Sequence, residues 1–261
     1  MNDLTLAQQL ADIADQVSLA RFRANDLVIN SKPDLTPVSD ADKKIEQLIR
    51  EHLLKVSPED GVIGEEFENK VSTNNREWIL DPIDGTKNYI RGVPIWATLI
   101  ALRQNNEITC TVVSAPAINR RWYASKGEGA YVVENILGKE VKRKLKVSAV
   151  SKISDASFAF AEVIKKDNWE DYYDKFLKLT NDVWRSRGFG DFWQHMLVAQ
   201  GAIDVAVDVI GLQPYDNAAI YPIVQEAGGA ITDRFGNSDW RADSSVSSNG
   251  VLHAEVISRL K

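Results

Sequence analysis

The sequence predicts a protein of mixed α and β structure in two halves, the first of the α+β class and the second of the α/β class. Up to about residue 138, two helical patterns precede a run of strands, whereas after residue 157 strand-like and helical segments alternate. A chain of 261 residues can bury a full core, as one large domain or as two smaller ones. We place the halves at residues 1–138 and 139–261 and expect them to pack closely together.

Two amphipathic helices are expected near the start of the chain. In the first, which should end near Phe22, apolar residues recur at alternating spacings of four and three: Leu6, Leu10, Ile13, Val17 and Ala20. The second has Ser39 or Asp40 as its N-cap, and its apolar face is formed by Ile45, Leu48, Ile49 and Leu53. The segment 30–37 between them contains two prolines, which predicts a loop.

The remainder of the first half is expected to form strands. Short apolar runs at 61–64 and 78–80 come first. Turn-forming residues separate the next runs, which lie at 95–102, 108–114, 121–124 and 129–133. This order predicts successive antiparallel strands. Residues 135–146 are polar and partly basic, and we interpret them as a connector between the halves.

The second half shows the alternation that is typical of α/β structure. Strands are expected at 158–161, 183–185 and 203–207, and helices at 169–179 and 192–199. A further helix is expected to begin with Asp216 as its N-cap and to end at the glycine pair 228–229. Because Pro222 lies past the first turn of that helix, we predict a kink or an irregular first turn there.

The charge and composition of the chain exclude several classes of function. With 37 acidic and 31 basic residues the net charge is −6, which argues against nucleic acid as a partner. No apolar run is long enough to span a bilayer and the N-terminus lacks a signal-peptide pattern, so we expect a cytoplasmic protein with no membrane partner. The one cysteine, Cys110, excludes an internal disulfide and a thiolate metal cluster.

The strongest chemical signal comes where a short apolar run meets two acids. The stretch reads Trp78-Ile-Leu-Asp-Pro-Ile-Asp-Gly-Thr86. Pro82 has no N–H to continue a strand ladder, so the chain should leave the sheet near Asp81. Asp81 and Asp84 repel each other unless a cation lies between them, and the N–H groups of Gly85 and Thr86 suit a phosphate. An ordinary turn explains the stretch equally well, so by itself it leaves both interpretations open.

Other acids in the chain could complete a metal site. Glu65 and Glu66 end the strand at 61–64, and because adjacent strand residues face opposite ways, at most one of them can join Asp81 and Asp84. Asp216 is a further candidate. No His or Cys pair has zinc-ligand spacing, and no Gly-x-Ser-x-Gly motif supports Ser-His-Asp catalysis. Carboxylate oxygens are the ligands that magnesium prefers.

Together these motifs resemble the inositol monophosphatase superfamily, and the resemblance runs through nearly the whole chain. The matching segments are Gly64-Glu-Glu66, Trp78 to Thr86, Tyr215-Asp-x-Ala-Ala219 and Glu226-Ala-Gly-Gly229. The resemblance implies a layered αβαβα sandwich and a homodimer. It also implies a magnesium-dependent phosphomonoesterase, with two or three Mg²⁺ ions per site, in which a metal-activated water attacks the phosphate directly.

The same resemblance implies roles for individual residues. The implied metal ligands are Glu65, Asp81, Asp84, Asp216 and the carbonyl of Ile83. Thr86 and Asp42 resemble the pair that orients or deprotonates the attacking water, with Glu65 as a further catalytic residue. The amides of Gly85 and Thr86 resemble the phosphate cradle. Asp42 also lies in the first turn of a predicted helix, where offsetting the helix dipole would alone explain it.

Within the superfamily, the chain looks most like the histidinol-phosphate phosphatases. The segments that carry this likeness are 31–42, 88–96 and Arg187-Gly-Phe-Gly-Asp191-Phe. L-Histidinol phosphate carries an amine and an imidazole, both able to meet carboxylates. Asp191 is the first candidate for the amine and Asp208 the second, with Arg187 as a further substrate contact. An ordinary N-cap is the alternative for Asp191, and a solvated loop lysine is the alternative to a role for Lys32 near the site.

Three alternatives for the function stay open. Inositol 1-phosphate or another sugar monophosphate could be the substrate of the same chemistry. A catalytically silent metal-binding regulatory protein could keep the fold. The stretch around Asp81 also resembles the Asp-x-Asp-Gly-Thr loop of haloacid-dehalogenase-type phosphatases, in which the first Asp is a covalent nucleophile. Here two residues rather than one separate the acids, so this alternative is disfavoured.

Overall fold

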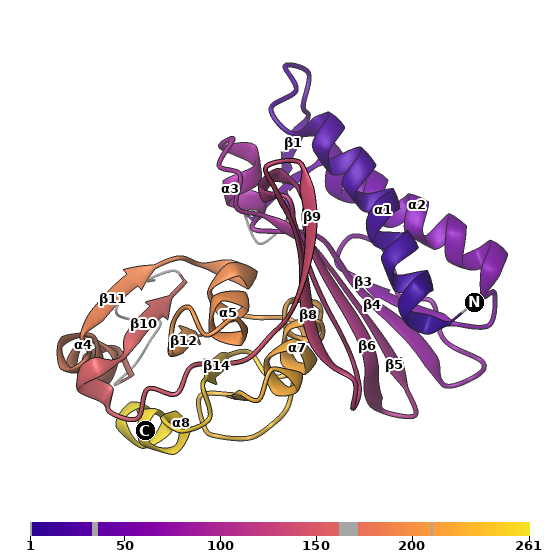
Figure 1. Cartoon of the computed structure of the whole chain (residues 1–261). Helices are drawn as coiled ribbons and strands as arrows, with labels where there is room; N and C mark the ends of the chain where they lie inside the picture. The colour runs from indigo at the N-terminus through magenta and orange to yellow at the C-terminus, as the bar shows by residue number, and fades with distance from the viewer. Residues whose placement is uncertain (1, 33–35, 162–171, 210) are drawn as a thin grey trace.

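The helices and sheets of the protein form five layers in the order αβαβα. The computed structural model describes residues 2–32, 36–161, 172–209 and 211–261. In Figure 1, the helices α1 (Asp3–Arg21) and α2 (Asp40–Val56) cover one face of a large sheet, and α5 (Asp191–Ala199) and α7 (Ile220–Glu226) lie between this sheet and a second one. Beyond the second sheet lie α4 (Tyr172–Asp182) and α8 (His253–Leu260). The expected layered sandwich is confirmed.

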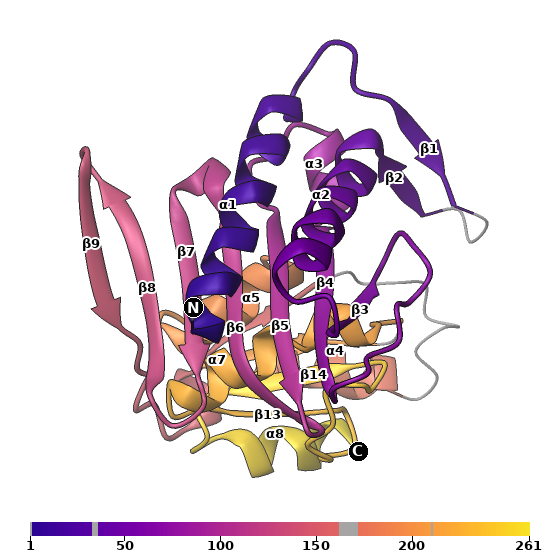
Figure 2. The same ribbon diagram turned by 90° about the vertical axis from the view of Figure 1, so that its right-hand side faces the viewer.

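The first sheet has seven strands whose order in space follows their order in the chain, as Figure 2 shows. Its strands are β3 (Gly61–Gly64), β4 (Arg76–Asp84), β5 (Ala97–Gln104), β6 (Glu107–Ala115), β7 (Arg120–Ser125), β8 (Gly129–Ile136) and β9 (Lys139–Lys144). Only β3 and β4 pair in parallel; the other neighbouring strands of this sheet are antiparallel. The predicted series of antiparallel strands is therefore confirmed.

Strand β4 continues further than the sequence predicts. Its pairing with β5 includes Asp81 and resumes at Asp84, with a shift of register between them. Pro82 lies within that shift, because a residue without an N–H cannot serve the ladder. The irregularity was therefore expected in the right place, but the chain bulges there instead of leaving the sheet.

The interpretation of residues 135–146 as a connector is wrong. Residues 139–144 form β9, which pairs with β8 at the edge of the first sheet. All six side chains of β9 are exposed, so the strand has no buried face and no apolar alternation to reveal it. Since β9 belongs to the first sheet, we propose that the division between the halves follows residue 144 instead of residue 138.

The second sheet has five strands in the order β11-β10-β12-β14-β13. Their bounds are β10 (Ser157–Phe160), β11 (Arg185–Gly188), β12 (Val205–Asp208), β13 (Ala230–Thr232) and β14 (Ser245–Ser248). The first three are mutually parallel, as the alternating pattern predicts, and the last two are antiparallel. Strands β13 and β14 and helix α8 were not predicted, because the strands are short and β14 consists of three serines and a valine.

The helices confirm most expectations and correct one. Ser39 is the N-cap of α2, and α4 is described from Tyr172, so the first three residues of the helix expected at 169–179 lie outside the described residues. Asp216 is not an N-cap. It lies inside the short helix α6 (Pro214–Asn217), whose N-cap is Gln213. Helix α7 begins only at Ile220, so the irregularity predicted near Pro222 is confirmed as a break between two helices.

The shorter elements lie at connections. Strands β1 (Ile29–Ser31) and β2 (Pro37–Ser39) form a small antiparallel pair where a loop was predicted, and α3 (Thr86–Ile90) follows β4. Two 3-10 turns are formed by Pro116–Ile118 and Ile153–Asp155. Within the described residues, no helix is both long enough and apolar enough to cross a membrane.

Four packed cores of described residues hold these layers together, and three of them are large. One lies between α1, α2 and the first sheet and includes Leu10, Ile45 and Trp78; another lies on the opposite face of this sheet against α5 and α7 and includes Trp122 and Phe192. A third, beneath the second sheet, is built with α4 and α8. Burial of these apolar side chains is the main favourable contribution to folding.

Asp60 offers a test of how the first core tolerates a buried polar group. Its carboxylate is 2% exposed, accepts from Trp78 Nε1 at 2.9 Å and pairs with Arg76 at 3.3 Å. The Asn74 amide also donates to Asp60 Oδ1, at 2.8 Å. Asp60→Ala leaves all three donors without this partner, which should cost about 3 kcal/mol and lower Tm by roughly 6–12 °C. Glu107→Ala, which breaks the exposed Glu107–Lys126 pair, is the control and should lower Tm by less than about 3 °C. Equal shifts in thermal unfolding would contradict this.

Candidate active site

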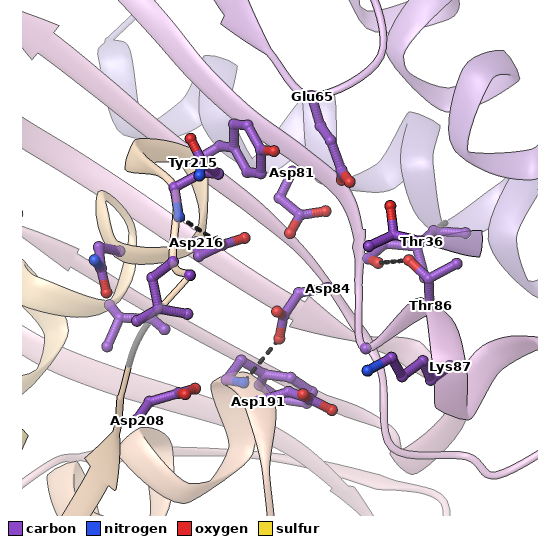
Figure 3. Close-up of a pocket in the computed structure, with 18 of the residues that line it drawn as sticks. Thr36, Glu65, Asp81, Asp84, Thr86, Lys87, Asp191, Asp208, Tyr215 and Asp216 are labelled. Carbon is purple, nitrogen blue, oxygen red and sulfur yellow. Dashed lines mark hydrogen bonds between the residues drawn. The ribbon is translucent and has the colours of Figure 1, made fainter. Parts of the chain in front are cut away.

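A cavity of about 590 Å³ opens where the two halves of the chain meet. Its walls come from the end of β4 and from α3 in the first half, and from α5, the end of β12 and α6 in the second. Figure 3 shows the carboxylates around it. Nearly all the residues that the sequence singles out for chemistry line this cavity: Lys32, Glu65, Asp81, Ile83, Asp84, Gly85, Thr86, Asp191, Asp208 and Asp216.

Three carboxylates form the centre of the cavity. Asp81, Asp84 and Asp216 each offer an oxygen, and these oxygens lie within 4.8 Å of one another. The first two come from the end of β4 and the third from α6, so both halves contribute. The register shift between Asp81 and Asp84 lets two acids of one strand serve the same cavity.

The clustered carboxylates repel one another, and this repulsion contributes to their raised pKa values. Burial, and then the neighbouring carboxylates, raise the pKa values of Asp81 and Asp84 well above the ordinary value. Burial together with the Glu65 carboxylate raises the pKa of Asp216 to about 7. The Oδ1 atom of Asp81 is buried without a hydrogen-bond partner. Closely spaced carboxylate oxygens that repel one another are a donor set that suits a hard divalent cation, so these residues fit such an ion.

Glu65 and Lys32 form the side of the cavity next to β3. Lys32 Nζ lies 2.5 Å from a carboxylate oxygen of Glu65 and 2.7 Å from one of Glu66. Of the two glutamates, Glu65 lines the cavity and Glu66 does not, in keeping with their opposite directions at a strand end. Burial raises the pKa of Glu65, while the Lys32 ammonium opposes that change.

The turn after β4 brings backbone close to the cavity. Gly85 has φ +83°, in the left-handed region that favours glycine, and it is the N-cap of α3. Thr86 begins α3, and its hydroxyl donates to the Ile83 carbonyl at 2.9 Å. The hydroxyl proton is therefore used in this hydrogen bond, and the lone pairs of the Thr86 oxygen remain available as acceptors.

Asp42 lies behind the cavity wall and does not line it. The residue is fully buried, and its Oδ2 accepts from both the backbone N–H and the hydroxyl of Ser39, at 2.8 and 2.6 Å. The two residues form a capping box at the start of α2, which places Asp42 in the first turn of the helix, where the alternative interpretation puts it. The other oxygen has no partner, and burial raises the pKa of Asp42 to about 7. A catalytic role for Asp42 stays a prediction.

The three predicted substrate residues are placed differently. Asp191 and Asp208 line the cavity, whereas Arg187 lies outside it. Arg187 belongs to β11 at the edge of the second sheet, where it is exposed and donates to the Ser186 carbonyl. The prediction for Arg187 therefore finds no support in this geometry.

Asp191 is not the N-cap of α5. It is the first residue of that helix, Gly190 is the cap, and the N–H of Phe192 donates to Asp84 Oδ2 at 2.7 Å. The acceptor for this N–H at the start of α5 is thus a carboxylate of the acidic cluster, 108 residues earlier in the chain. The alternative of Asp191 as an ordinary N-cap is wrong.

Several cavity residues were missed by the sequence analysis. Lys87, the second residue of α3, points into the cavity in Figure 3. The sequence pattern that could have identified it is a lysine directly after Gly85-Thr86, the predicted phosphate-binding residues. Tyr215 and Ser245 also line the cavity. His195 is a further residue of the cavity wall, and its nitrogens lie 2.8 and 3.3 Å from the Ser247 and Ser245 hydroxyls. Burial lowers its pKa to about 3, so it is neutral.

Asp216 gives a test of the repulsion within the cluster. Because its folded pKa is raised from 3.8 to about 7, it contributes stability below pH 3.8 that is lost as pH rises through 7. Asp216→Asn removes this loss, so the metal-free variant should melt above the metal-free wild type at pH 8, by about 3 °C, with the difference shrinking toward pH 4. Thermal unfolding in excess chelator measures it. A lower Tm for the variant at pH 8 would show that repulsion is not the dominant interaction.

Comparison with known proteins places the chain in a family. The model of the inositol monophosphatase family matches residues 2–261. The chain is 46% identical to a histidinol-phosphatase of Streptomyces coelicolor, with 100% of this chain and 97% of the relative covered, and 45% identical to one of Mycobacterium tuberculosis, with 99% and 98% covered. It is 33% identical to an inositol-1-monophosphatase of Rhizobium meliloti, with 84% and 81% covered.

Solved structures agree with the family match. The extragenic suppressor protein SuhB of Bartonella henselae superposes with a TM-score of 0.87 at 27% identity, over 98% of this chain and 97% of that one. An IMPase of Thermotoga maritima gives a TM-score of 0.84 at 25% identity, over 100% and 97%. The chain belongs to the inositol monophosphatase family.

Proposed function

We propose that this protein is a magnesium-dependent phosphomonoesterase that hydrolyses L-histidinol phosphate to L-histidinol and phosphate. The family match and the histidinol-phosphatase relatives support the chemistry and the substrate. The observation that carries the substrate is the position of Asp191. Its Oδ2 lies 3.1 Å from where a Cβ on Gly85 would be, so a carboxylate stands directly beside the turn after β4. A cationic group of a bound ester can reach it there.

The residues that would hold magnesium are the acids of the cluster. Glu65, Asp81, Asp84 and Asp216, with the carbonyl of Ile83, would bind two or three ions. When bound, magnesium would neutralise the charge of the phosphate and lower the pKa of the water that attacks phosphorus. Direct attack by water requires no covalent intermediate.

The chain's own groups can orient and deprotonate that water. The Thr86 hydroxyl donates a hydrogen bond to the Ile83 carbonyl, so its oxygen can accept a hydrogen bond from a water and fix the direction of attack. Glu65, at the cavity, and Asp42, behind it, are carboxylates with raised pKa values. A base whose pKa is near the working pH suits proton transfer at neutral pH.

The phosphate would lie against the turn at the start of α3. The backbone N–H groups of Gly85 and Thr86 are neutral donors, and Lys87 adds a cation that points to the same cavity. At the other end, Asp191 would meet the amine, with Asp208 as the second carboxylate on that side.

Inositol 1-phosphate is the second candidate substrate, because an inositol-1-monophosphatase is among the relatives. A homodimer, which the family resemblance implies, is also part of the proposal. Sedimentation equilibrium would test the dimer independently of catalysis, since it needs no substrate.

The substrate assignment predicts a preference for the cationic ester. With magnesium present, kcat/KM for L-histidinol phosphate should exceed that for inositol 1-phosphate by about tenfold or more, because a charge-assisted bond to Asp191 is made only by the amine. Phosphate release under matched conditions measures both. An equal or higher value for the inositol ester would refute histidinol phosphate as the substrate.

Asp191→Asn isolates the charge of that carboxylate. The variant keeps the shape of the side chain, so kcat/KM for L-histidinol phosphate should fall by about 10-fold to 100-fold while the value for inositol 1-phosphate changes much less. Asp239→Asn, at an exposed position outside the cavity lining, is the matched control and should change neither value. If Asp191→Asn lowered both values equally, Asp191 would have only a structural role.

A further inference from the structure

The backbone of Asp191 is held in an unfavourable conformation. Its φ is +46°, in the left-handed region that residues with a side chain rarely adopt. Gly190 before it also has a positive φ, of +77°. Together they turn the chain so that the Phe192 N–H meets Asp84 and the side chain of Asp191 borders the cavity. Strain of this kind persists only where surrounding contacts maintain it.

One of these contacts is made by Asn88 of helix α3. Its Nδ2 donates to Asp191 Oδ2 at 3.2 Å and to the Ile95 carbonyl at 2.9 Å. A side-chain amide has two N–H donors, and in Asn88 each of them has an acceptor. Ile95 fixes the amide from the first half of the chain, and the amide in turn holds one oxygen of Asp191 from the second half.

The position of this contact explains why it matters. Asp191 lies next to Asp84, because the N–H of Phe192, the residue directly after Asp191, donates to Asp84 Oδ2 at 2.7 Å. The two carboxylates therefore repel each other across the cavity edge. Asn88 orients the Asp191 carboxylate against that repulsion without adding any charge of its own.

We propose that Asn88 is a positioning residue that sets the direction of the Asp191 carboxylate and so determines the selectivity for phosphate monoesters that carry a cationic amine. The inference rests on the proposed function. Asn88 does not line the cavity, and it acts on the substrate only through Asp191.

The test compares kcat and KM for L-histidinol phosphate and for inositol 1-phosphate in wild type, Asn88→Ala, Asp191→Asn and the double variant. In Asn88→Ala, the ratio of the two kcat/KM values should fall by about tenfold, through KM for the cationic ester. The double variant should show the ratio of Asp191→Asn alone, because the two residues act through one contact. An unchanged ratio in Asn88→Ala, or multiplied effects in the double variant, would overturn the proposal.

Two further variants keep the test decisive. Asn88→Ala also loses the hydrogen bond to Ile95 and could therefore unfold. Asn88→Ser replaces the amide with a short hydroxyl and tests the same contact in a second variant. It should show the same fall in the ratio of the two kcat/KM values. Asn181→Ala is the matched control, because this exposed amide of α4 donates to the Leu177 carbonyl of its own helix, far from the cavity residues in the sequence. It should leave the ratio unchanged, and Tm is measured for every variant.

The two hypotheses fail in different ways. If the wild type shows no preference for the cationic ester, the proposed function fails and the role of Asn88 fails with it. If the wild type prefers the cationic ester and the Asn88 variants keep that preference, only the role of Asn88 is refuted.

Discussion

Repulsion among buried carboxylates is the constraint on which the structure of this site depends. The fold holds oxygens of Asp81, Asp84 and Asp216 within 4.8 Å of one another, although burial and mutual proximity raise their pKa values. Such an arrangement is unfavourable by itself, and it persists because the apolar cores on both faces of the first sheet fix β4, while the packing of α7 fixes the segment that precedes it. A divalent cation would relieve the repulsion, so the geometry that costs stability without metal is also the geometry that would favour metal binding.

Hydrogen bonds also link the acidic cluster to the residues that are proposed to determine substrate selectivity. Asp84 belongs to the cluster, and one of its oxygens accepts from the Phe192 N–H at the start of α5. The first residue of the same helix is Asp191, and its carboxylate is held by Asn88, four residues after Asp84 in the chain. The position of the Asp191 carboxylate is therefore coupled to that of the Asp84 carboxylate by two hydrogen bonds. If the proposed function holds, this coupling would keep the phosphate site and the amine site of the cavity at a fixed separation.

Much of this could be predicted from the sequence, and the parts that could not have physical reasons. Strands and helices with a buried face, such as β5 and α2, show in apolar periodicity, whereas β9 is exposed on every residue and β14 is mostly serine. The acids near Asp81 and Asp216 were identified because carboxylates at strand ends and turns point to one chemistry. The contact of Asn88 with Asp191 spans 103 residues, and no local pattern records it. The same reason applies to Arg187, which was predicted to contact the substrate. Its position outside the cavity follows from the order of the strands, which puts β11 at the edge of the second sheet.

The central claim is that carboxylates from both halves of the chain form one divalent-cation site. Anomalous diffraction from crystals grown with Mn²⁺ in place of Mg²⁺ tests it most directly, because the ion is located without reference to activity. We predict anomalous peaks within ligand distance, about 2.2 Å, of oxygens of Asp81, Asp84 and Asp216. A crystal with Mn²⁺ bound elsewhere, and no peak among these three carboxylates, would contradict the claim.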